Sequence, residues 1–327
     1  MMIDAHAHVL PPDYPERRGF PIMSPVSEDV AREIVSNTHP TDLREDFFRA
    51  EARLEALDAA GVDQEIVSPM PPLLNYSLPV AVGRDLFRHV NDSLANMVDS
   101  GLGRIHGMGI VPLQDPAVAA AELSTFAGLG LRGVEVGSQV NGVPIGDRRF
   151  LEVFQEAERL GLSILVHTLQ RADEVGLAPS LSVSVGVGIE ATRGAASVLL
   201  GETAQRCSLD HVMFTHAGGG LPSILARADH FWGTSAEAGR TLEPPSALAR
   251  RVYYDSMTFE PHGLRFIVDF LGADRVVLGS DFPGIARPAR LDDQLVSLGL
   301  GEADHARVTH ANALHFLHLS RSMSVYN

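Results

Sequence analysis

Eight short apolar segments alternate with helix-like segments along the chain, and this alternation constrains the fold more than any other feature. The apolar segments are 2–8, 65–68, 105–111, 133–136, 163–167, 211–216, 252–255 and 275–281. Apolar periodicity and turn residues predict helices at 42–60, 80–99, 116–129, 149–160, 189–205, 217–231, 261–271 and 303–316. Eight strands, each followed by a helix, are the number that closes a parallel β/α barrel.

We therefore predict an α/β fold, a TIM-type (β/α)8 barrel in which residues 1–327 form a single domain. A doubly wound open sheet is the alternative, but no G-x-G-x-x-G motif follows the first strand. Residues 9–42 are rich in proline and serine and lack a sustained periodicity. This stretch predicts a long loop insertion after the first strand, which we expect to act as a lid or pocket wall over the barrel mouth.

Composition argues against several classes of partner and compartment. A net charge of -15 disfavours nucleic acid and anionic membranes, because neither is attracted to an acidic surface. Cys207 is the only cysteine, which forbids an internal disulfide and suggests a reducing compartment. The N-terminus has no signal-peptide pattern, and no apolar run approaches the roughly 20 residues of a membrane span. We expect a cytoplasmic protein.

Two histidines in the first predicted strand suggest a metal site. Side chains at positions i and i+2 of a strand share one face and lie about 7 Å apart, so His6 and His8 can approach a single ion together. On a helix the same spacing would turn the two side chains away from each other. The simpler interpretation is two histidines on a surface turn, and Pro11 and Pro12 just downstream fit either view.

Polar residues also end three later strands, where barrels of this type carry their chemistry. His167, His216 and Asp281 end the fifth, sixth and eighth predicted strands. Each has a simpler explanation: a hydrogen-bonded core histidine, a tight strand-to-helix turn, or an aspartate that caps a turn before Pro283. The glycines at 218–220 could instead let a ligand approach the backbone and leave N–H groups free for an anion.

Together these side chains form a set that suits one metal ion. His6, His8, His167 and Asp281 supply three nitrogens and one carboxylate, which fits Zn²⁺ with a position kept for water or substrate. His216 would then transfer protons beside the metal. All 26 basic residues are arginine, so the chain cannot build a site bridged by a carboxylated lysine. A single ion is therefore expected.

The chain resembles the amidohydrolase superfamily, and within it the decarboxylase-like branch typified by 2-amino-3-carboxymuconate-6-semialdehyde decarboxylase. The likeness runs nearly end to end and is strongest in four motifs. These are Ile3-Asp4-Ala5-His6-Ala7-His8, Val166-His167, Thr215-His216-Ala217-Gly218-Gly219-Gly220 and Leu278-Gly279-Ser280-Asp281-Phe282-Pro283. Weaker matches are 57–62 and 111–116.

The resemblance implies roles for particular residues. It implies that one Zn²⁺, or another divalent ion such as Mn²⁺, is held by His6, His8, His167 and Asp281. His216 would act on the metal-bound water. Arg227, eleven residues after His216, would reach into the neighbouring subunit's site and bind a substrate carboxylate, which implies a homodimer. The alternative is that Arg227 is a residue on the surface of a helix with no role in the site. Arg44 is a weaker candidate for a carboxylate-binding arginine in the same subunit.

Two departures from the family pattern bear on the substrate. The decarboxylase named above has a tryptophan in the loop after the fifth strand, whereas Trp232 is the only tryptophan here and lies elsewhere. Thr168 stands where the family usually has proline. The substrate is therefore expected to be a different compound.

Three functions follow as hypotheses. The first is a Zn-dependent, non-oxidative decarboxylase of a small unsaturated or aromatic carboxylic acid, in which His216 and Asp281 transfer the proton that replaces CO2. The second is a hydrolase of an amide, lactone or C–C bond that uses a zinc-bound hydroxide. The third is a metal-binding scaffold without activity. All five site positions are intact, which disfavours the third.

Overall fold

A computed structural model describes residues 1–13, 45–169, 177–178, 181–234, 243–285, 287–288 and 290–319. Most of the predicted insertion at 9–42 lies outside these described residues, and so does Arg44. The predicted role of the insertion as a lid therefore stays a prediction.

Eight parallel strands form one sheet in the order β1-β2-β3-β4-β7-β8-β9-β10. They are β1 (Ile3–Val9), β2 (Gln64–Pro69), β3 (Ile105–Ile110), β4 (Gly133–Gly137), β7 (Ser163–His167), β8 (Val212–Phe214), β9 (Tyr253–Asp255) and β10 (Val276–Val277). The last strand returns to the first: the Ala5 N–H donates to the Leu278 carbonyl at 2.8 Å, and Ala7 bridges Phe282. The predicted (β/α)8 barrel is confirmed.

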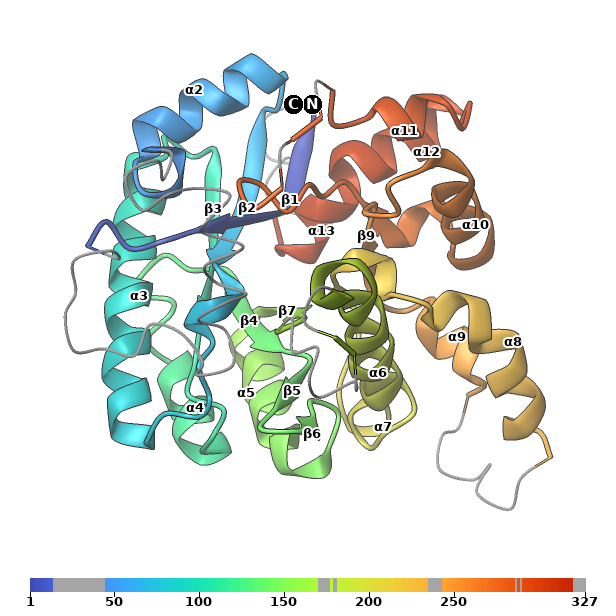
Figure 1. Ribbon diagram of the computed structural model, residues 1–327, viewed down its shortest axis with the longest axis horizontal. Helices are drawn as coiled ribbons and strands as arrows, with labels where there is room; N and C mark the ends of the chain where they lie inside the picture. Colours follow the sequence, from blue (N-terminus) through green and yellow to red (C-terminus); the bar gives the residue numbers. More distant parts are fainter. Residues whose placement is uncertain are drawn as a thin grey trace.

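Helices surround the strands on the outside (Figure 1). They are α2 (Ala50–Ala60), α3 (Val80–Ser100), α4 (Pro116–Leu123), α5 (Leu151–Leu160), α6 (Val187–Leu199), α7 (Thr203–Arg206), α8 (Leu221–Trp232), α9 (Pro245–Ala249), α10 (Pro261–Leu271), α11 (Asp293–Val296), α12 (Glu302–Ala306) and α13 (Asn312–Phe316). Gly61 and Gly161 end α2 and α5 in the left-handed conformation, as expected of helix-ending glycines.

Several expected elements are shorter than predicted. The helix expected at 42–60 begins at Ala50, because Arg49 is extended. The segment at 303–316 is divided into α12, a π-helical turn and α13. The strand expected at 275–281 covers only Val276–Val277. It stops because Ser280 and Asp281 both donate their N–H groups to the His6 carbonyl and Asp281 has a φ of 59°.

A small hairpin that we did not predict follows β4. Its strands are β5 (Gln139–Val140) and β6 (Val143–Pro144), and they pair antiparallel. Asn141 and Gly142 form the turn with φ values of 48° and 84°. Asn-Gly is the dipeptide that such two-residue turns favour, since both positions need positive φ.

Apolar side chains fill the lower barrel interior and leave its upper end polar. The interior cluster draws one or two residues from most strands: Ile3, Ala5, Ile66, Met108, Leu165, Met213, Tyr253 and Val277. Phe316, the last residue of α13, and Leu317 belong to the same cluster and are fully buried. Burying a Phe or Leu side chain stabilises a fold by roughly 1.5–3 kcal/mol, so the C-terminal helix is held firmly against the barrel.

One helical stretch, Ser182–Arg206, is long and apolar enough to cross a membrane by length and composition alone. The expectation that no apolar run approaches the length of a membrane span is therefore wrong for this stretch. Of its apolar window, 44% is buried inside the protein, where α6 packs as part of the helical layer.

Candidate metal centre

A bulge in β1 places two histidines in the barrel interior. Asp4 pairs with Glu65 but Ala7 pairs with Val67, so one extra residue is inserted in β1 between these positions. Ile3 and Ala5 belong to the interior cluster below, and His6 and His8 face the same interior above it. The bulge therefore changes which residues of β1 point inward.

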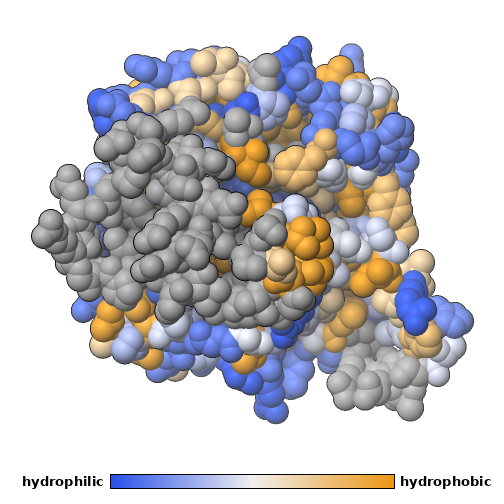
Figure 2. Space-filling view, in the orientation of Figure 1, coloured by the Kyte–Doolittle hydropathy of each residue, from blue (hydrophilic) through white to orange (hydrophobic). Residues whose placement is uncertain are grey.

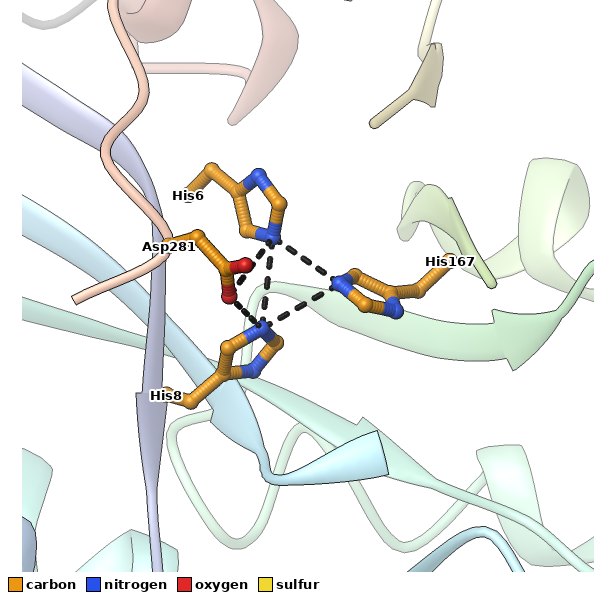
Figure 3. A group of neighbouring side chains, drawn as sticks. All are labelled: His6, His8, His167 and Asp281. Carbon is orange, nitrogen blue, oxygen red and sulfur yellow. Dashed lines mark hydrogen bonds and ion pairs between the residues drawn. The ribbon is translucent and has the colours of Figure 1, made fainter. Parts of the chain in front are cut away.

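Four side chains converge at the upper end of the barrel (Figure 3). The Nε2 atoms of His6, His8 and His167 lie 3.0–3.2 Å from one another. Oδ1 of Asp281 lies 3.0 Å from Nε2 of His8 and 3.8 Å from Nε2 of His6. The four predicted ligands are thus brought together, although they come from residues 6 to 281 of the chain.

The other ring nitrogen of each histidine already has a partner. Nδ1 of His6 lies 2.7 Å from Oδ2 of Asp255, and Nδ1 of His167 lies 2.7 Å from the Thr168 carbonyl oxygen. Nδ1 of His8 lies 3.2 Å from the Ser68 hydroxyl. The Asp255 carboxylate and the Thr168 carbonyl can only accept, so they hold the protons of His6 and His167 on Nδ1, and the Ser68 hydroxyl can accept from His8 in the same way. With these tautomers three Nε2 lone pairs face one another. Such a group is repulsive by itself and fits a cation at its centre.

The electrostatics of the cluster also favour a positive charge. Burial by itself lowers the pKa of His6, but the Asp255 hydrogen bond and the charges of Asp281, Asp255 and Asp4 raise the pKa to about 9. Burial opposes ionisation of Asp281, yet the His8 hydrogen bond and the neighbouring imidazoles hold its pKa below the ordinary value. The site thus draws a proton to His6. A bound divalent cation would meet the same demand and displace that proton.

His216 lies beside the cluster without joining it. Its ring centre is 5.3 Å from that of His6 and 5.1 Å from that of His167. Its Nε2 is shielded from solvent and has no hydrogen-bond partner among the described residues. Burial lowers the pKa of His216 to about 4, so the ring is neutral at neutral pH. Its φ of 54° is strained for a residue other than glycine, as is often seen at functional sites.

The glycines after His216 serve the backbone rather than an anion. Residues 216–219 all have positive φ. The N–H groups of Gly218, Gly219 and Gly220 donate to the Thr215 carbonyl, the His216 carbonyl and the Thr192 hydroxyl. The alternative that these N–H groups face an anion is therefore wrong for this chain, and the tight-turn alternative is the one observed.

Three buried polar residues near the centre were not assigned a role from the sequence. Asp255 and Ser68 end the predicted strands 252–255 and 65–68, and a polar residue at a strand end was their only signal. Asp255 also accepts the His216 and Ala217 N–H groups at 2.8 and 2.7 Å. Glu135 on β4 is fully buried, and burial raises its pKa well above the ordinary value, so it is a neutral acid at neutral pH. In the sequence, the only indication that Glu135 has a role is that it is a single carboxylate within an apolar strand.

A sequence profile of the family described as Amidohydrolase matches residues 3–319. The chain belongs to this family. It is 25% identical over 332 residues to 2-amino-3-carboxymuconate-6-semialdehyde decarboxylase of Dictyostelium discoideum, covering 98% of this chain and 92% of that protein. The predicted resemblance is thereby confirmed.

Solved structures share the amidohydrolase barrel. A 5-carboxyvanillate decarboxylase from Sphingomonas paucimobilis gives a TM-score of 0.82 at 23% identity, covering 97% of this chain and 98% of that one. A dihydroxybenzoic acid decarboxylase from Polaromonas sp. JS666, with bound manganese and 2-nitroresorcinol, gives 0.76 at 20% identity, covering 100% and 99%. These likenesses extend over the entire fold.

The remaining predicted residues of this amidohydrolase lie apart from the cluster or outside the described chain. Arg227 is exposed on α8, with its guanidinium carbon 4.8 Å from the ring centre of Phe231. Arg44 lies outside the described residues. Thr168, where the family usually has proline, contacts His167 through its carbonyl, which proline also has. That departure leaves the contact intact.

Proposed function

We propose that this amidohydrolase is a metal-dependent, non-oxidative decarboxylase of a small aromatic or unsaturated carboxylic acid. The observation that carries the proposal is the convergence of three Nε2 atoms and one carboxylate oxygen, with every histidine fixed through Nδ1. The relatives and the structural neighbours reported above are decarboxylases by name.

The proposed ligands of one divalent ion are His6, His8, His167 and Asp281. A bound cation supplies Lewis acidity, orients the substrate's oxygens and offsets the charge of its carboxylate. Three imidazoles and one carboxylate suit Zn²⁺, which we propose as the native ion. Mn²⁺ is the competitor, because the dihydroxybenzoic acid decarboxylase contains manganese. Metal analysis of protein purified without added metal distinguishes the two ions.

The chain's own residues would handle the proton. Decarboxylation breaks the bond between the carboxylate and the substrate carbon, leaves the electron pair on that carbon and releases CO2. A proton taken from solvent water must then replace CO2 on that carbon. His216 has a neutral imidazole beside the cluster whose Nε2 is shielded from solvent and has no partner among the described residues, so it can accept a proton and pass it on. Asp281, which is ionised, is the partner that we propose for this transfer.

Arginine would bind the substrate's remaining anion. We assign Arg227 to this role in the neighbouring subunit of a homodimer and Arg44 to the same subunit. Support comes from the exposed face of α8, where Arg227 lies near Ile224 and Phe231, 45% and 50% exposed. Mixing Arg227→Ala with His216→Ala subunits should restore activity, because some hybrid sites then contain both residues. If activity is not restored at any mixing ratio, the two subunits do not share a site.

We place the protein in the cytoplasm. The free Cys207 is buried, and burial raises the pKa of its thiol to about 11, so the thiol is unreactive. A single inert thiol is ordinary in a reducing compartment.

The experiment that tests the reaction is a panel of hydroxybenzoates and muconate-type acids, run in oxygen-labelled water. CO2 release without labelled oxygen in the organic product is expected of the decarboxylase. Incorporation of label into that product would show hydrolysis and overturn the proposal. Stoichiometric metal with no turnover on the whole panel would instead favour a scaffold.

A further inference from the structure

Four charged side chains form a closed group on the outer side of β1 and β2, and we name it the buried charge quartet. It consists of Asp4, Glu65, Arg53 and Arg287. The first three are 0% exposed, and the side chain of Arg287 is 4% exposed. Nε of Arg287 donates to Oδ2 of Asp4 at 3.0 Å, and its Nη2 donates to Oε2 of Glu65 at 2.9 Å. Nε of Arg53 donates to Oε1 of Glu65.

The quartet contacts the backbone on both sides of the candidate metal centre. Nη1 of Arg53 donates to the carbonyl of His8 at 2.7 Å. Oδ1 of Asp4 accepts the N–H of His6 at 3.2 Å and the N–H of Ser280 at 3.1 Å. The network therefore holds a backbone group of His6, one of His8 and one of Ser280, which precedes Asp281.

Both arginines of the quartet lie over the ring of Phe282. The guanidinium carbon of Arg287 is 4.1 Å from its ring centre, and that of Arg53 is 5.3 Å away. A cation over an aromatic face is attracted to it, more strongly when both are desolvated. Asp281 is thus preceded by Ser280, which Asp4 binds, and followed by Phe282, which the arginines hold.

A buried group of charges is a costly way to stabilise a fold, because packed apolar residues often do as well. Directional bonds from a planar fork do something that apolar packing does not: they fix the position of backbone atoms. We propose that Arg287 is a positioning residue that fixes Asp281, through Asp4 and Phe282, at the distance needed for metal binding. This inference rests on the proposed role of Asp281 as a ligand.

The test replaces Arg287 with lysine, which keeps the charge and removes the fork. We expect Arg287→Lys to weaken Co²⁺ binding about tenfold, the lower range for groups that orient metal ligands. The visible absorption of bound Co²⁺ should also change, because Asp281 moves. The matched control is Arg104→Lys. Arg104 makes three hydrogen bonds of 2.7–2.9 Å near the N-terminal ends of β2 and β3. The Arg104→Lys substitution should lower thermal stability and leave Co²⁺ affinity and the Co²⁺ spectrum unchanged.

Wild-type Co²⁺ affinity and spectrum in Arg287→Lys would overturn the inference. If that variant does not fold, Phe282→Leu tests the same link without altering a charge. It should change affinity and spectrum in the same direction, and wild-type values overturn the inference. Asp281→Asn separates the two proposals. If it binds Co²⁺ as the wild type does, the proposed ligand set is wrong. If it loses affinity while Arg287→Lys does not, only the positioning role fails.

Discussion

Asp255 connects the two halves of the candidate centre at the scale of single residues. Its Oδ2 lies 2.7 Å from Nδ1 of His6, and the same oxygen accepts the N–H of His216 at 2.8 Å. One carboxylate therefore orients a proposed metal ligand and holds the backbone of the proposed proton-transfer residue. Partners of this kind fix the tautomer and basicity of a ligating histidine.

Asp255→Asn should weaken metal binding about 10- to 100-fold, because an amide no longer stabilises the Nδ1 proton of His6 as a carboxylate does. Competition with a chromophoric chelator measures the change. Asp274→Asn is the control, since Asp274 is an exposed carboxylate paired with Arg275 at 3.4 Å. Equal metal affinity in the two variants would show that Asp255 does not orient His6.

His216→Ala should retain the metal and lose activity, whereas His6→Ala should lose both. The reason is that Nε2 of His6 faces the other three donors, while His216 only adjoins them. Metal content by elemental analysis and CO2 release from the same preparations provide the comparison. If the metal content falls equally in the two variants, the division between ligand and proton carrier is wrong.

The turn from β8 to α8 shows how an element carries His216 to its place. Its backbone is left-handed from His216 to Gly219. A Cβ on Gly218 would lie 2.8 Å from the Tyr254 ring, and one on Gly219 would lie 2.1 Å from the Gly188 carbonyl oxygen. The turn therefore packs directly against the backbone of the first turn of α6. Glycine is needed there for both space and conformation.

Gly219→Ala should lower the free energy of unfolding by about 2 kcal/mol more than Gly161→Ala. Both glycines have positive φ, 62° and 67°, but Gly161 has a ψ of 34°, which alanine can adopt with some strain, whereas Gly219 has a ψ of -132°, which strains alanine more. Only Gly219 also meets a backbone oxygen, whereas a Cβ on Gly161 meets nothing within 4 Å. Urea titration of both variants checks this. Equal losses would mean that the contact with Gly188 relaxes freely.

The sequence allowed the proposed ligands to be predicted, but not their hydrogen-bond partners or every structural element. His6, His8, His167 and Asp281 were predictable because barrel strands bring their ends together. Their partners were not, because Ser68 and Asp255 lie on other strands and Thr168 contributes only a backbone carbonyl. The Asn141-Gly142 turn carried a usable signal that we overlooked. The division of the last helix rests on a π-helical turn, which no periodicity marks.

At the scale of the whole molecule, a partly buried neutral histidine makes stability depend on pH. Burial lowers the pKa of His106 on β3 from 6.5 to about 4, with Arg132 adding to the effect. Below pH 6.5 the unfolded chain takes up a proton at this position that the folded chain does not. The stabilisation is therefore complete above about pH 6.5 and is lost as the pH falls towards 4.

His106→Gln should flatten this part of the stability profile, by at most about 3 kcal/mol between pH 6.5 and 4. Glutamine keeps a polar group opposite Gln64, whose Oε1 lies 3.0 Å from Nε2 of His106. Unfolding free energies of both proteins across this range provide the measurement. Parallel curves would assign the acid sensitivity to other groups.

One surface feature is independent of this titration. Apolar side chains gather beside the start of α6 in Figure 2, where Leu181, Val183 and Ile189 are exposed.

The spread of the four donors along the chain has a consequence for biosynthesis. Two come from the first strand and one from β7, but the fourth follows the last strand, at residue 281. A polypeptide still emerging from the ribosome lacks that proposed donor until residue 281 has been made. Capture of an ion by the full proposed set therefore requires synthesis past this residue, and products terminated before it lack the fourth proposed ligand.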